Sequence, residues 1–435
     1  MTKSSGTILD GGSRPEGRGA GTEPRNAPAG TARCRSCGGK DLRVFLSLGD
    51  MPLSDGLLTS GEPQRREPRY PLDVAFCPSC ALVQILETVP PEQLFGADYP
   101  YFSSFTDALL EHSRANVAAR IEERRLDGHS LVIELASNDG YLLQFYRARG
   151  IPVLGIDPAA GPVAAAREKG IETLQAFFGR ELAQQLAAEG RRADVIHANN
   201  VLAHVADTRG FVAGIGELLK DDGVAVIEAP YVKELIDKRE FDTIYHEHLC
   251  YFSVTALVSL FQRHGLSLNR VEPLEIHGGS LRLFVERGER ADRSVDEYLR
   301  AERASGLDRL DYYADFSSHV MRLRSELVTL LQGLKRGGAR IAGYGAAAKG
   351  TIMLNFCGIG RELLDWVADR NVHKQGRYIP GVRLPIVEPA QIIAQQPDYL
   401  LILPWNFKQE IMQQQAEYRR RGGRFIVPVP QPVIV

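Results

Sequence analysis

Short apolar runs that end in polar residues or glycine recur through the middle of the chain. Residues 131–135, 152–157, 193–198 and 223–230 are four such runs. Runs of this length, bounded by turn residues, are typical of strands that are buried on both faces of a parallel sheet. Helical patterns lie between them. The region therefore predicts a doubly wound α/β domain, whose ligands bind at the carboxyl ends of the strands.

Helices are predicted on either side of these strands. Over 107–126 the apolar residues recur at the spacing of an amphipathic helix. The run 193–198 ends in Asn199 and Asn200, and a helix is expected to begin directly afterwards, at Val201. Polar side chains at the end of a parallel strand line the ligand crevice of such a fold.

The C-terminal third repeats the pattern of strand, glycine turn and helix. An amphipathic helix over about 312–335 leads to a strand and a Gly-Tyr-Gly turn within 340–350. Apolar runs at 365–369 and 398–403 predict further parallel strands. These patterns indicate a second, Rossmann-like α/β domain.

The glycine turn of this C-terminal pattern favours an anionic ligand. Helix N-termini with small residues accept phosphate, and Lys349 adds a positive charge. Tyr344 lies in the same turn, so both are candidate substrate-binding residues. A NAD site is the alternative, although the turn lacks the third glycine of the dinucleotide motif. The polar run 369–376 either lies beside this site or is an ordinary solvated loop.

The N-terminal region contains two cysteine pairs behind a polar leader. Residues 1–33 are rich in Gly, Pro, Ser, Thr and Arg and are expected to be disordered. Cys34 and Cys37, then Cys77 and Cys80, form two C-x2-C pairs. Four thiolates complete the closed tetrahedral shell of a structural zinc site. Disulfide chemistry is the competing interpretation, but this spacing in a cytosolic chain favours the metal, within a small β-rich lobe.

Composition and charge narrow the class of protein. The 435 residues are 44% hydrophobic and 24% charged, with a formal net charge of −2, so a nucleic-acid partner is not expected. No apolar run approaches the roughly 20 residues that span a bilayer, and the N-terminus lacks an apolar signal core. We expect a cytoplasmic protein without a membrane partner, as a monomer or small homo-oligomer. The expected division is a leader over 1–33, a zinc-binding domain over 34–105, a central domain over 106–290, a helical connector over 291–335 and a C-terminal domain over 336–435.

The loop after the first strand indicates a cofactor site. It runs from Glu134 to Gly140 and resembles the first motif of class I S-adenosylmethionine-dependent methyltransferases, although Ala136 and Asn138 stand where glycines are usual. The second strand ends in Asp157, where such folds place an acid that binds ribose hydroxyls. A Rossmann dehydrogenase would share both features, but the missing glycines disfavour a dinucleotide. The candidate cofactor-binding residues are Glu134, Asn138, Gly140, Asp157, Phe178 and Asn199, with Phe178 equally able to be a core residue.

A third group of chemically active residues lies between 245 and 248. Tyr245, His246, Glu247 and His248 place two imidazoles, a carboxylate and a phenol together. Histidine is the side chain that titrates nearest neutrality, so such a segment suits proton transfer. Alone, it could also bind a metal or cap a helix.

Taken together, these motifs resemble the sugar C-methyltransferase family over nearly the whole chain from Cys34 to Val435. Members methylate carbon 3 of nucleotide-linked 4-keto deoxysugars in antibiotic and surface-polysaccharide pathways. The resemblance implies a zinc lobe and a C-terminal α/β domain on either side of a class I methyltransferase core. The motifs that carry it are the two C-x2-C pairs, Tyr99-Pro-Tyr101, the loop to Gly140, Asn200-x3-His204, Phe241-Asp-x-Ile-Tyr245-x-Glu247-His248, His277-Gly-Gly279 and Gly343-Tyr-Gly-Ala-x-Ala-Lys349.

The resemblance also implies a catalytic set of Tyr99, Asn200, His204, Tyr245, Glu247 and His248. Methylation of a carbon next to a ketone requires an enolate, and this chemistry suggests the role of each residue. His248 is the expected general base, Glu247 tunes the site or binds a hydroxyl, and Tyr245 and His204 donate to the enolate oxygen. Tyr99 and Asn200 orient the sugar, and His246 receives no role. S-adenosylmethionine and structural Zn²⁺ are the expected cofactors. Methylation of a hydroxyl or amine, and a NAD-linked role, remain open alternatives.

Overall fold

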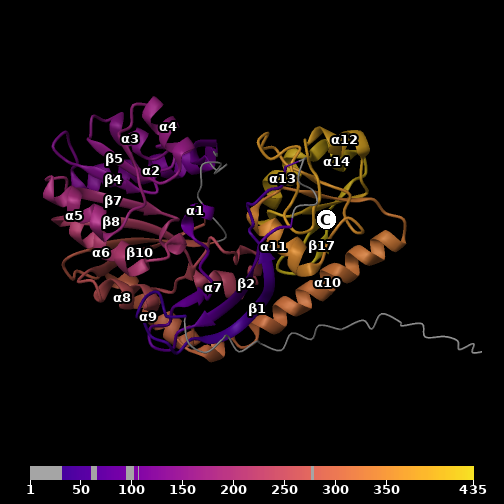
Figure 1. The fold of residues 1–435 in the computed structure, drawn as a ribbon, viewed down its shortest axis with the longest axis horizontal. Helices are drawn as coiled ribbons and strands as arrows, with labels where there is room; N and C mark the ends of the chain where they lie inside the picture. The colour runs from indigo at the N-terminus through magenta and orange to yellow at the C-terminus, as the bar shows by residue number, and fades with distance from the viewer. Residues whose placement is uncertain (1–31, 60–65, 95–101, 106, 276–278) are drawn as a thin grey trace, which may run out of the picture.

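The computed structural model describes residues 32–59, 66–94, 102–105, 107–275 and 279–435 of the chain (Figure 1). Three sheets organise these residues: one of four strands, one of seven and one of six. The predicted α/β architecture, with a zinc lobe, a central methyltransferase-type domain and a C-terminal Rossmann-like domain, is confirmed. Most of the expected leader, together with Tyr99, Tyr101 and His277, lies outside the described residues.

The central sheet has the strand order β10-β11-β8-β7-β4-β5-β6. β4 through β8 are parallel, whereas β10 and β11 form an antiparallel hairpin at one edge, with β11 against β8. From β4 the chain continues to β5 and β6 on one side of the sheet and then returns to β7 and β8 on the other side. The switch point for ligand binding is therefore at the carboxyl end of β4. The strands are β4 (Val132–Leu135), β5 (Val153–Asp157), β6 (Thr173–Gln175), β7 (Ala193–Asn199), β8 (Leu219–Pro230), β10 (Ser267–Leu274) and β11 (Ser280–Glu286).

Helices connect these strands, with one difference from the expectation. The helix predicted to begin at Val201 is wrong: residues Leu202–His204 form only a 3-10 turn, η2, and Val205 is extended. The α-helix begins at Thr208, where the Asp207 side chain accepts a hydrogen bond from the Gly210 amide and caps it. The helices are α2 (Asp107–Arg124), α3 (Leu143–Arg147), α4 (Ala160–Glu168), α5 (Arg180–Ala188), α6 (Thr208–Leu218), α7 (Val232–Asp237) and α8 (Val254–Gln262).

The zinc-lobe sheet takes one strand from a distant part of the sequence. β1 (Arg43–Pro52), β2 (Arg69–Phe76) and β3 (Val83–Ile85) are consecutive, and the fourth strand is β9 (Cys250–Tyr251). β9 directly follows the Tyr245–His248 segment. In Figure 1, β1 and β2 lie at the junction between the central domain and the C-terminal domain.

The C-terminal sheet has the order β14-β13-β12-β15-β16-β17 and is parallel apart from β17. The long helix α10 (Phe316–Arg336) leads into it and contacts both β1 and α11 (Ala348–Cys357). α9 (Arg293–Ser305) precedes α10. The strands are β12 (Ile341–Tyr344), β13 (Val367–Ala368), β14 (Ile386–Val387), β15 (Tyr399–Ile402), β16 (Arg424–Val427) and β17 (Val433–Ile434).

Candidate active site and zinc centre

The four paired cysteines meet at one point of the zinc lobe. Their sulfur atoms all lie within 4.8 Å of one another, and the closest approaches are Cys34 to Cys80 at 3.4 Å and Cys37 to Cys77 at 3.6 Å. A tetrahedron with Zn–S bonds of about 2.3 Å has sulfur separations of about 3.8 Å, and a disulfide has about 2.0 Å. The amides of Cys37 and Gly39 point at the sulfurs of Cys34 and Cys37, as amides do around a thiolate centre. The set therefore fits Zn²⁺ and not a disulfide.

We expect Cys34→Ser to lose the zinc and much of the stability of the lobe, because a structural metal contributes folding free energy directly. Metal analysis should find about one zinc per chain in the parent protein and little in the variant, with a lower melting temperature. Cys357→Ser is the matched control, since Cys357 is buried in α11 outside the cluster. A variant that keeps a full equivalent of zinc would contradict the assignment.

The predicted cofactor loop adopts glycine-like backbone angles although two of its positions are not glycine. Ala136 has φ +56°, Asn138 has φ +49° and Gly140 has φ +74°. Asparagine tolerates this left-handed region, whereas alanine there costs roughly 1–2 kcal/mol. Ala136 and Asn138 therefore adopt the left-handed conformation that glycine usually provides in this motif.

Hydrogen bonds tie this loop to the end of the second strand. The Asn138 amide donates to Asp157 Oδ2 at 2.9 Å, and the Ala159 amide donates to Oδ1 at 2.8 Å. Burial raises the pKa of Asp157, and these two amides lower it. Burial also raises the pKa of Glu134 well above its usual range, while the Tyr141 hydroxyl, bonded to it, acts in the opposite direction.

The residues at this edge of the sheet fit S-adenosylmethionine by their chemistry. Glu134 is fully buried, Asp157 is 5% exposed, and the buried Asn199 Oδ1 has no hydrogen-bond partner among the described residues. Three acceptors at the switch point suit the hydroxyl and amino donors of such a ligand. Phe178 instead lies edge-on to Phe211 of α6 at 5.3 Å, so its role beside an adenine stays a prediction.

The Tyr245–His248 segment brings its aromatic side chains together. The rings of Tyr245 and His248 are 4.0 Å apart, and those of His204 and His248 are 4.7 Å apart. The Leu249 amide donates to the Ala203 carbonyl at 2.8 Å, which holds this segment against η2. Residues from two separate parts of the central domain are thus in one cluster.

The hydrogen bond of His248 determines where its proton lies. Nδ1 is 2.8 Å from the Thr243 carbonyl oxygen, in the short helix η3 (Phe241–Thr243). A carbonyl can only accept, so Nδ1 donates and Nε2 of the neutral ring carries the lone pair. A lone pair on the ring nitrogen is what a general base requires.

The second histidine of the cluster, His204, has a pKa that burial controls. Burial lowers the pKa of His204 to about 4, although a hydrogen bond to the Glu247 backbone raises it slightly. The ring is therefore neutral near pH 7, and its one N–H donates to the Glu247 carbonyl, so Nδ1 carries the lone pair and the expected donation to the enolate oxygen is not prepared in this arrangement. Asn200 precedes this turn at the end of β7 with φ +52°, and its amide donates to the Glu228 carbonyl at 2.8 Å.

Glu247 receives contributions from the other two domains. It is 6% exposed, and burial raises its pKa well above the usual range. The Asp55 carboxylate raises this pKa further, and the Lys374 ammonium lowers it. Lys374 Nζ lies 3.9 Å from Asp55 Oδ1 and donates to the Ala346 carbonyl at 2.8 Å. Asp55 and Lys374 were not among the residues that the sequence predicted, and only the charged run 369–376 had indicated Lys374.

Lys349 lies at a second junction of the central and C-terminal domains. Its Nζ donates to Asn406 Oδ1 at 3.0 Å and is 4.9 Å from the centre of the Trp405 ring. Trp405 Nε1 donates to Asp242 Oδ2 at 2.8 Å. Burial raises the pKa of Glu240 to about 7 and that of Asp242 to about 6, while Lys349 lowers both.

The two C-terminal residues predicted to bind substrate are therefore held by protein groups. Tyr344 is 4% exposed, and its hydroxyl lies 3.4 Å from Gln414 Oε1. A phosphate-binding role for Lys349, and a substrate role for Tyr344, stay predictions. The carboxyl of Glu240 had no signal in the sequence, and Asp242 was part of the motif from Phe241 to His248 but received no role.

The raised pKa of Glu240 predicts a pH dependence of stability. Because its folded pKa is about 7 and its ordinary value is 4.5, its contribution is fully present below about pH 4.5 and is lost as the pH rises through 7. At pH 8 the buried charge costs up to about 3 kcal/mol. We expect Glu240→Gln to raise the melting temperature at pH 8 by several degrees and to change it little at pH 5. The exposed Glu326→Gln is the control, and an equal shift at both pH values would contradict the prediction.

Comparison with known proteins identifies the family. Models of three domains match the chain: a zinc binding domain over residues 34–95, a methyltransferase domain over 107–271 and a C-methyltransferase C-terminal domain over 275–430. The chain is 36% identical to C-methyltransferase NovU of Streptomyces niveus over 406 residues, which cover 92% of this chain and 96% of the relative. No helix among the described residues is long and apolar enough to cross a membrane.

More distant matches cover a smaller part of the chain. The ubiquinone biosynthesis O-methyltransferase of Azorhizobium caulinodans is 28% identical over 22% of this chain and 38% of its own length. The structure of magnesium protoporphyrin IX methyltransferase from Synechocystis PCC 6803, with bound SAM, has 16% identity and a TM-score of 0.31, covering 42% of this chain and 82% of that one. The predictions of an S-adenosylmethionine-dependent methyltransferase and of a zinc-binding module are confirmed, in preference to the NAD-linked alternative. From Cys34 to its C-terminal domain, the chain belongs to the C-methyltransferase family of NovU.

Proposed function

We propose that this protein methylates carbon 3 of a nucleotide-linked 4-keto deoxysugar through an enolate. The observation that supports this most is the state of His248, whose Nδ1 donates to the Thr243 carbonyl and leaves Nε2 basic. A neutral His204 and the Tyr245 phenol lie beside it. A base next to a hydrogen-bond donor, here the Tyr245 phenol, is the arrangement that removal of a proton next to a ketone needs.

The methyl donor would be held at the switch point of the central sheet. Glu134, Asn138, Gly140, Asp157 and Asn199 are the proposed contacts, since they are acceptors or closely approaching backbone at the ends of three adjacent strands. Bound there, S-adenosylmethionine supplies an electrophilic methyl group. The loop keeps a fixed conformation through the Asn138–Asp157 hydrogen bond, so little ordering is required when the ligand binds.

The protein's own groups would carry the proton chemistry. His248 Nε2 takes the proton from the carbon next to the ketone, and the negative charge moves to the ketone oxygen. Tyr245 donates a hydrogen bond to that oxygen, and this bond is strongest when the charge has formed. His204 would add a second only from the tautomer that gives up its bond to the Glu247 carbonyl. Tyr99 and Asn200 are proposed to orient the sugar, and Lys349 and Tyr344 the nucleotide portion.

Glu247 would bind a sugar hydroxyl in its protonated form. Burial raises the pKa of its carboxyl and so favours the protonated form, which can both donate and accept a hydrogen bond. Asp55 and Lys374 keep opposite charges beside it. A neutral carboxyl next to the enolate avoids repulsion of the developing negative charge.

The reaction is tested by identifying the product. The protein is incubated with S-adenosylmethionine and a panel of thymidine- and uridine-diphosphate-linked 4-keto deoxysugars, and the products are analysed by mass spectrometry and carbon–proton NMR. A gain of one methyl group, with the new signal on a carbon next to the ketone, is expected. A methoxy or N-methyl signal would instead establish O- or N-methylation and would rule out the proposed carbon acceptor.

A further inference from the structure

The proposed catalytic segment is attached to the zinc-lobe sheet on one side and to the η2 turn of the central domain on the other. On one side, β9 pairs with β3 of the zinc lobe, with Cys250 opposite Gln84 and Tyr251 opposite Val83. The Ile85 amide extends this ladder by donating to the Leu249 carbonyl at 3.1 Å. On the other side, the Leu249 amide donates to Ala203 in the central domain. Residues 245–248 therefore enter the site from a strand that belongs to the zinc lobe.

A short chain of hydrogen bonds connects this strand to the metal-binding turn. Arg35 lies between Cys34 and Cys37, and its amide donates to Gln84 Oε1 at 2.8 Å. Gln84 Nε2 donates to the Arg33 carbonyl at 3.2 Å, so both ends of this side chain are bonded to the turn. Gln84 is 1% exposed. The residue that pairs with Cys250 through its backbone is thus held to the zinc turn through its side chain.

His246 provides a second anchor from inside the catalytic segment. It is 1% exposed, and its Nε2 lies 3.2 Å from the Pro71 carbonyl oxygen of β2. The carbonyl accepts, so Nε2 is the protonated nitrogen. The ring also meets Tyr70 of the same strand edge-on at 5.7 Å. His246 stands between Tyr245 and Glu247, and it points into the zinc lobe, whereas His248 faces Tyr245 and His204.

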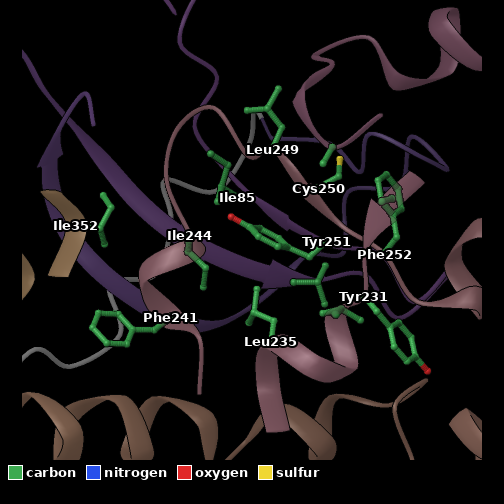
Figure 2. Packing of buried hydrophobic residues seen from close by; sticks show 14 of the residues in the cluster. Ile85, Tyr231, Leu235, Phe241, Ile244, Leu249, Cys250, Tyr251, Phe252 and Ile352 are labelled. Carbon is green, nitrogen blue, oxygen red and sulfur yellow. The ribbon is translucent and has the colours of Figure 1, made fainter. Parts of the chain in front are cut away.

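Apolar packing completes the attachment. Figure 2 shows Leu249 and Tyr251 close to Ile85 above the zinc-lobe strands, with Ile244 beside them. All four side chains are at most 5% exposed. This packing and these hydrogen bonds attach the segment to the zinc lobe.

We infer that the zinc lobe positions the catalytic segment, with His246 and Gln84 as the positioning residues. This inference rests on the proposed catalytic roles of Tyr245, Glu247 and His248. Neither His246 nor Gln84 touches the reacting atoms. Each fixes the position of the base and its neighbours relative to the zinc lobe. A displacement of about 1 Å of such groups can lower a rate by about 10²-fold. The cofactor loop belongs to the other sheet and should keep its affinity.

The experiment uses His246→Phe, which keeps a ring but loses the bond to Pro71, and Gln84→Leu, which loses both bonds to the zinc turn. His246→Gln is the conservative variant, because its amide can still donate to the Pro71 carbonyl. Tyr70→Phe is the control, since it removes only a hydroxyl that lies 3.1 Å from Gln93 Oε1. Each variant is measured for kcat and KM with a thymidine-diphosphate-linked 4-keto-6-deoxyglucose, for S-adenosylmethionine affinity, for zinc content and for amide hydrogen exchange.

We expect His246→Phe and Gln84→Leu to lower kcat by about 10–100-fold and to accelerate hydrogen exchange in residues 244–252. KM, cofactor affinity, zinc content and exchange in residues 131–140 should change little. His246→Gln should recover most of kcat, and Tyr70→Phe should match the parent protein. Removal of zinc from the parent protein by a chelator should accelerate exchange in 244–252 before it does so in 131–140.

The outcomes separate this inference from the proposed function. Unchanged exchange in 244–252, both in the two variants and after zinc removal, would overturn the positioning role. Faster exchange with an unchanged kcat would support the attachment to the zinc lobe and overturn the catalytic assignment of the segment. If a variant loses its fold, the comparison of parent protein with and without zinc still decides the question.

Discussion

Replacing His248 by asparagine should lower both proton exchange and methyl transfer by about 10²–10⁴-fold, the range that a general base contributes. Asparagine keeps hydrogen-bonding groups near the Thr243 carbonyl but has no basic nitrogen. With substrate and S-adenosylhomocysteine in deuterium oxide, the parent protein should incorporate deuterium at the carbon next to the ketone. The His248→Asn variant should bind the sugar without this exchange. NMR of the recovered substrate measures the label.

Tyr245→Phe is the matched variant for this experiment. It removes a donor to the enolate oxygen and keeps the ring that lies 4.0 Å from His248, so exchange and methylation should slow by about 10²–10³-fold. Normal exchange in the His248 variant would place the base elsewhere, and His204 or Tyr245 would then take that role. A pKa of about 4 makes His204 a weaker base than an ordinary histidine.

Replacing Gly140 by valine should weaken S-adenosylmethionine binding by at least about 100-fold. Gly140 has φ +74°, and a Cβ there would lie 2.3 Å from Ile171 Cδ1. A branched side chain therefore meets both backbone strain, of about 1–2 kcal/mol, and a collision with the core. The end of the Ile171 side chain, the loop or both would have to move, and movement of the loop would shift the contacts around Asp157. Isothermal titration calorimetry with the cofactor measures the loss.

Gly150→Val separates strain from collision. Gly150 has φ +72°, but no atom lies within 4 Å of its built Cβ. This variant should lose stability to a similar backbone term and keep its affinity for the cofactor. If Gly140→Val folds and binds as tightly as the parent protein, the loop is not the cofactor site.

Local sequence patterns predicted several strands of the central sheet and misplaced one helix. The parallel strands β4, β5, β7 and β8 were predictable because each contains a short apolar run, such as Val132–Leu135, of the kind that is buried on both faces of a parallel sheet. The edge strands β10 and β11 were not expected. The helix expected at Val201 was wrong for a local reason that the apolar pattern does not contain. Asn200 takes a left-handed φ of +52°, and the helix begins only after the Asp207 cap.

Covalent spacing determined each half of the zinc centre and the position of the cofactor loop, whereas the meeting of the two cysteine pairs required the fold of the zinc lobe. In a C-x2-C turn, the chain itself brings two sulfurs together, and a strand followed at once by a loop places that loop at the edge of the sheet. The sequence also placed Tyr245, Glu247 and His248 within four residues, so their proximity required no tertiary contact. Only their roles remained to be argued.

Tertiary structure alone decided what surrounds those residues. Glu247 meets Asp55 and Lys374, the Trp405 indole binds Asp242 across 163 positions of sequence, and His246 reaches Pro71 across 175. No local pattern encodes such contacts, because they arise when sheets from three parts of the chain pack against one another. The sequence determined which chemical groups this protein has and in which local turns they lie. The packing of the three sheets decided which of these groups are buried and which charges they face. Burial and nearby charges in turn set the pKa of each group.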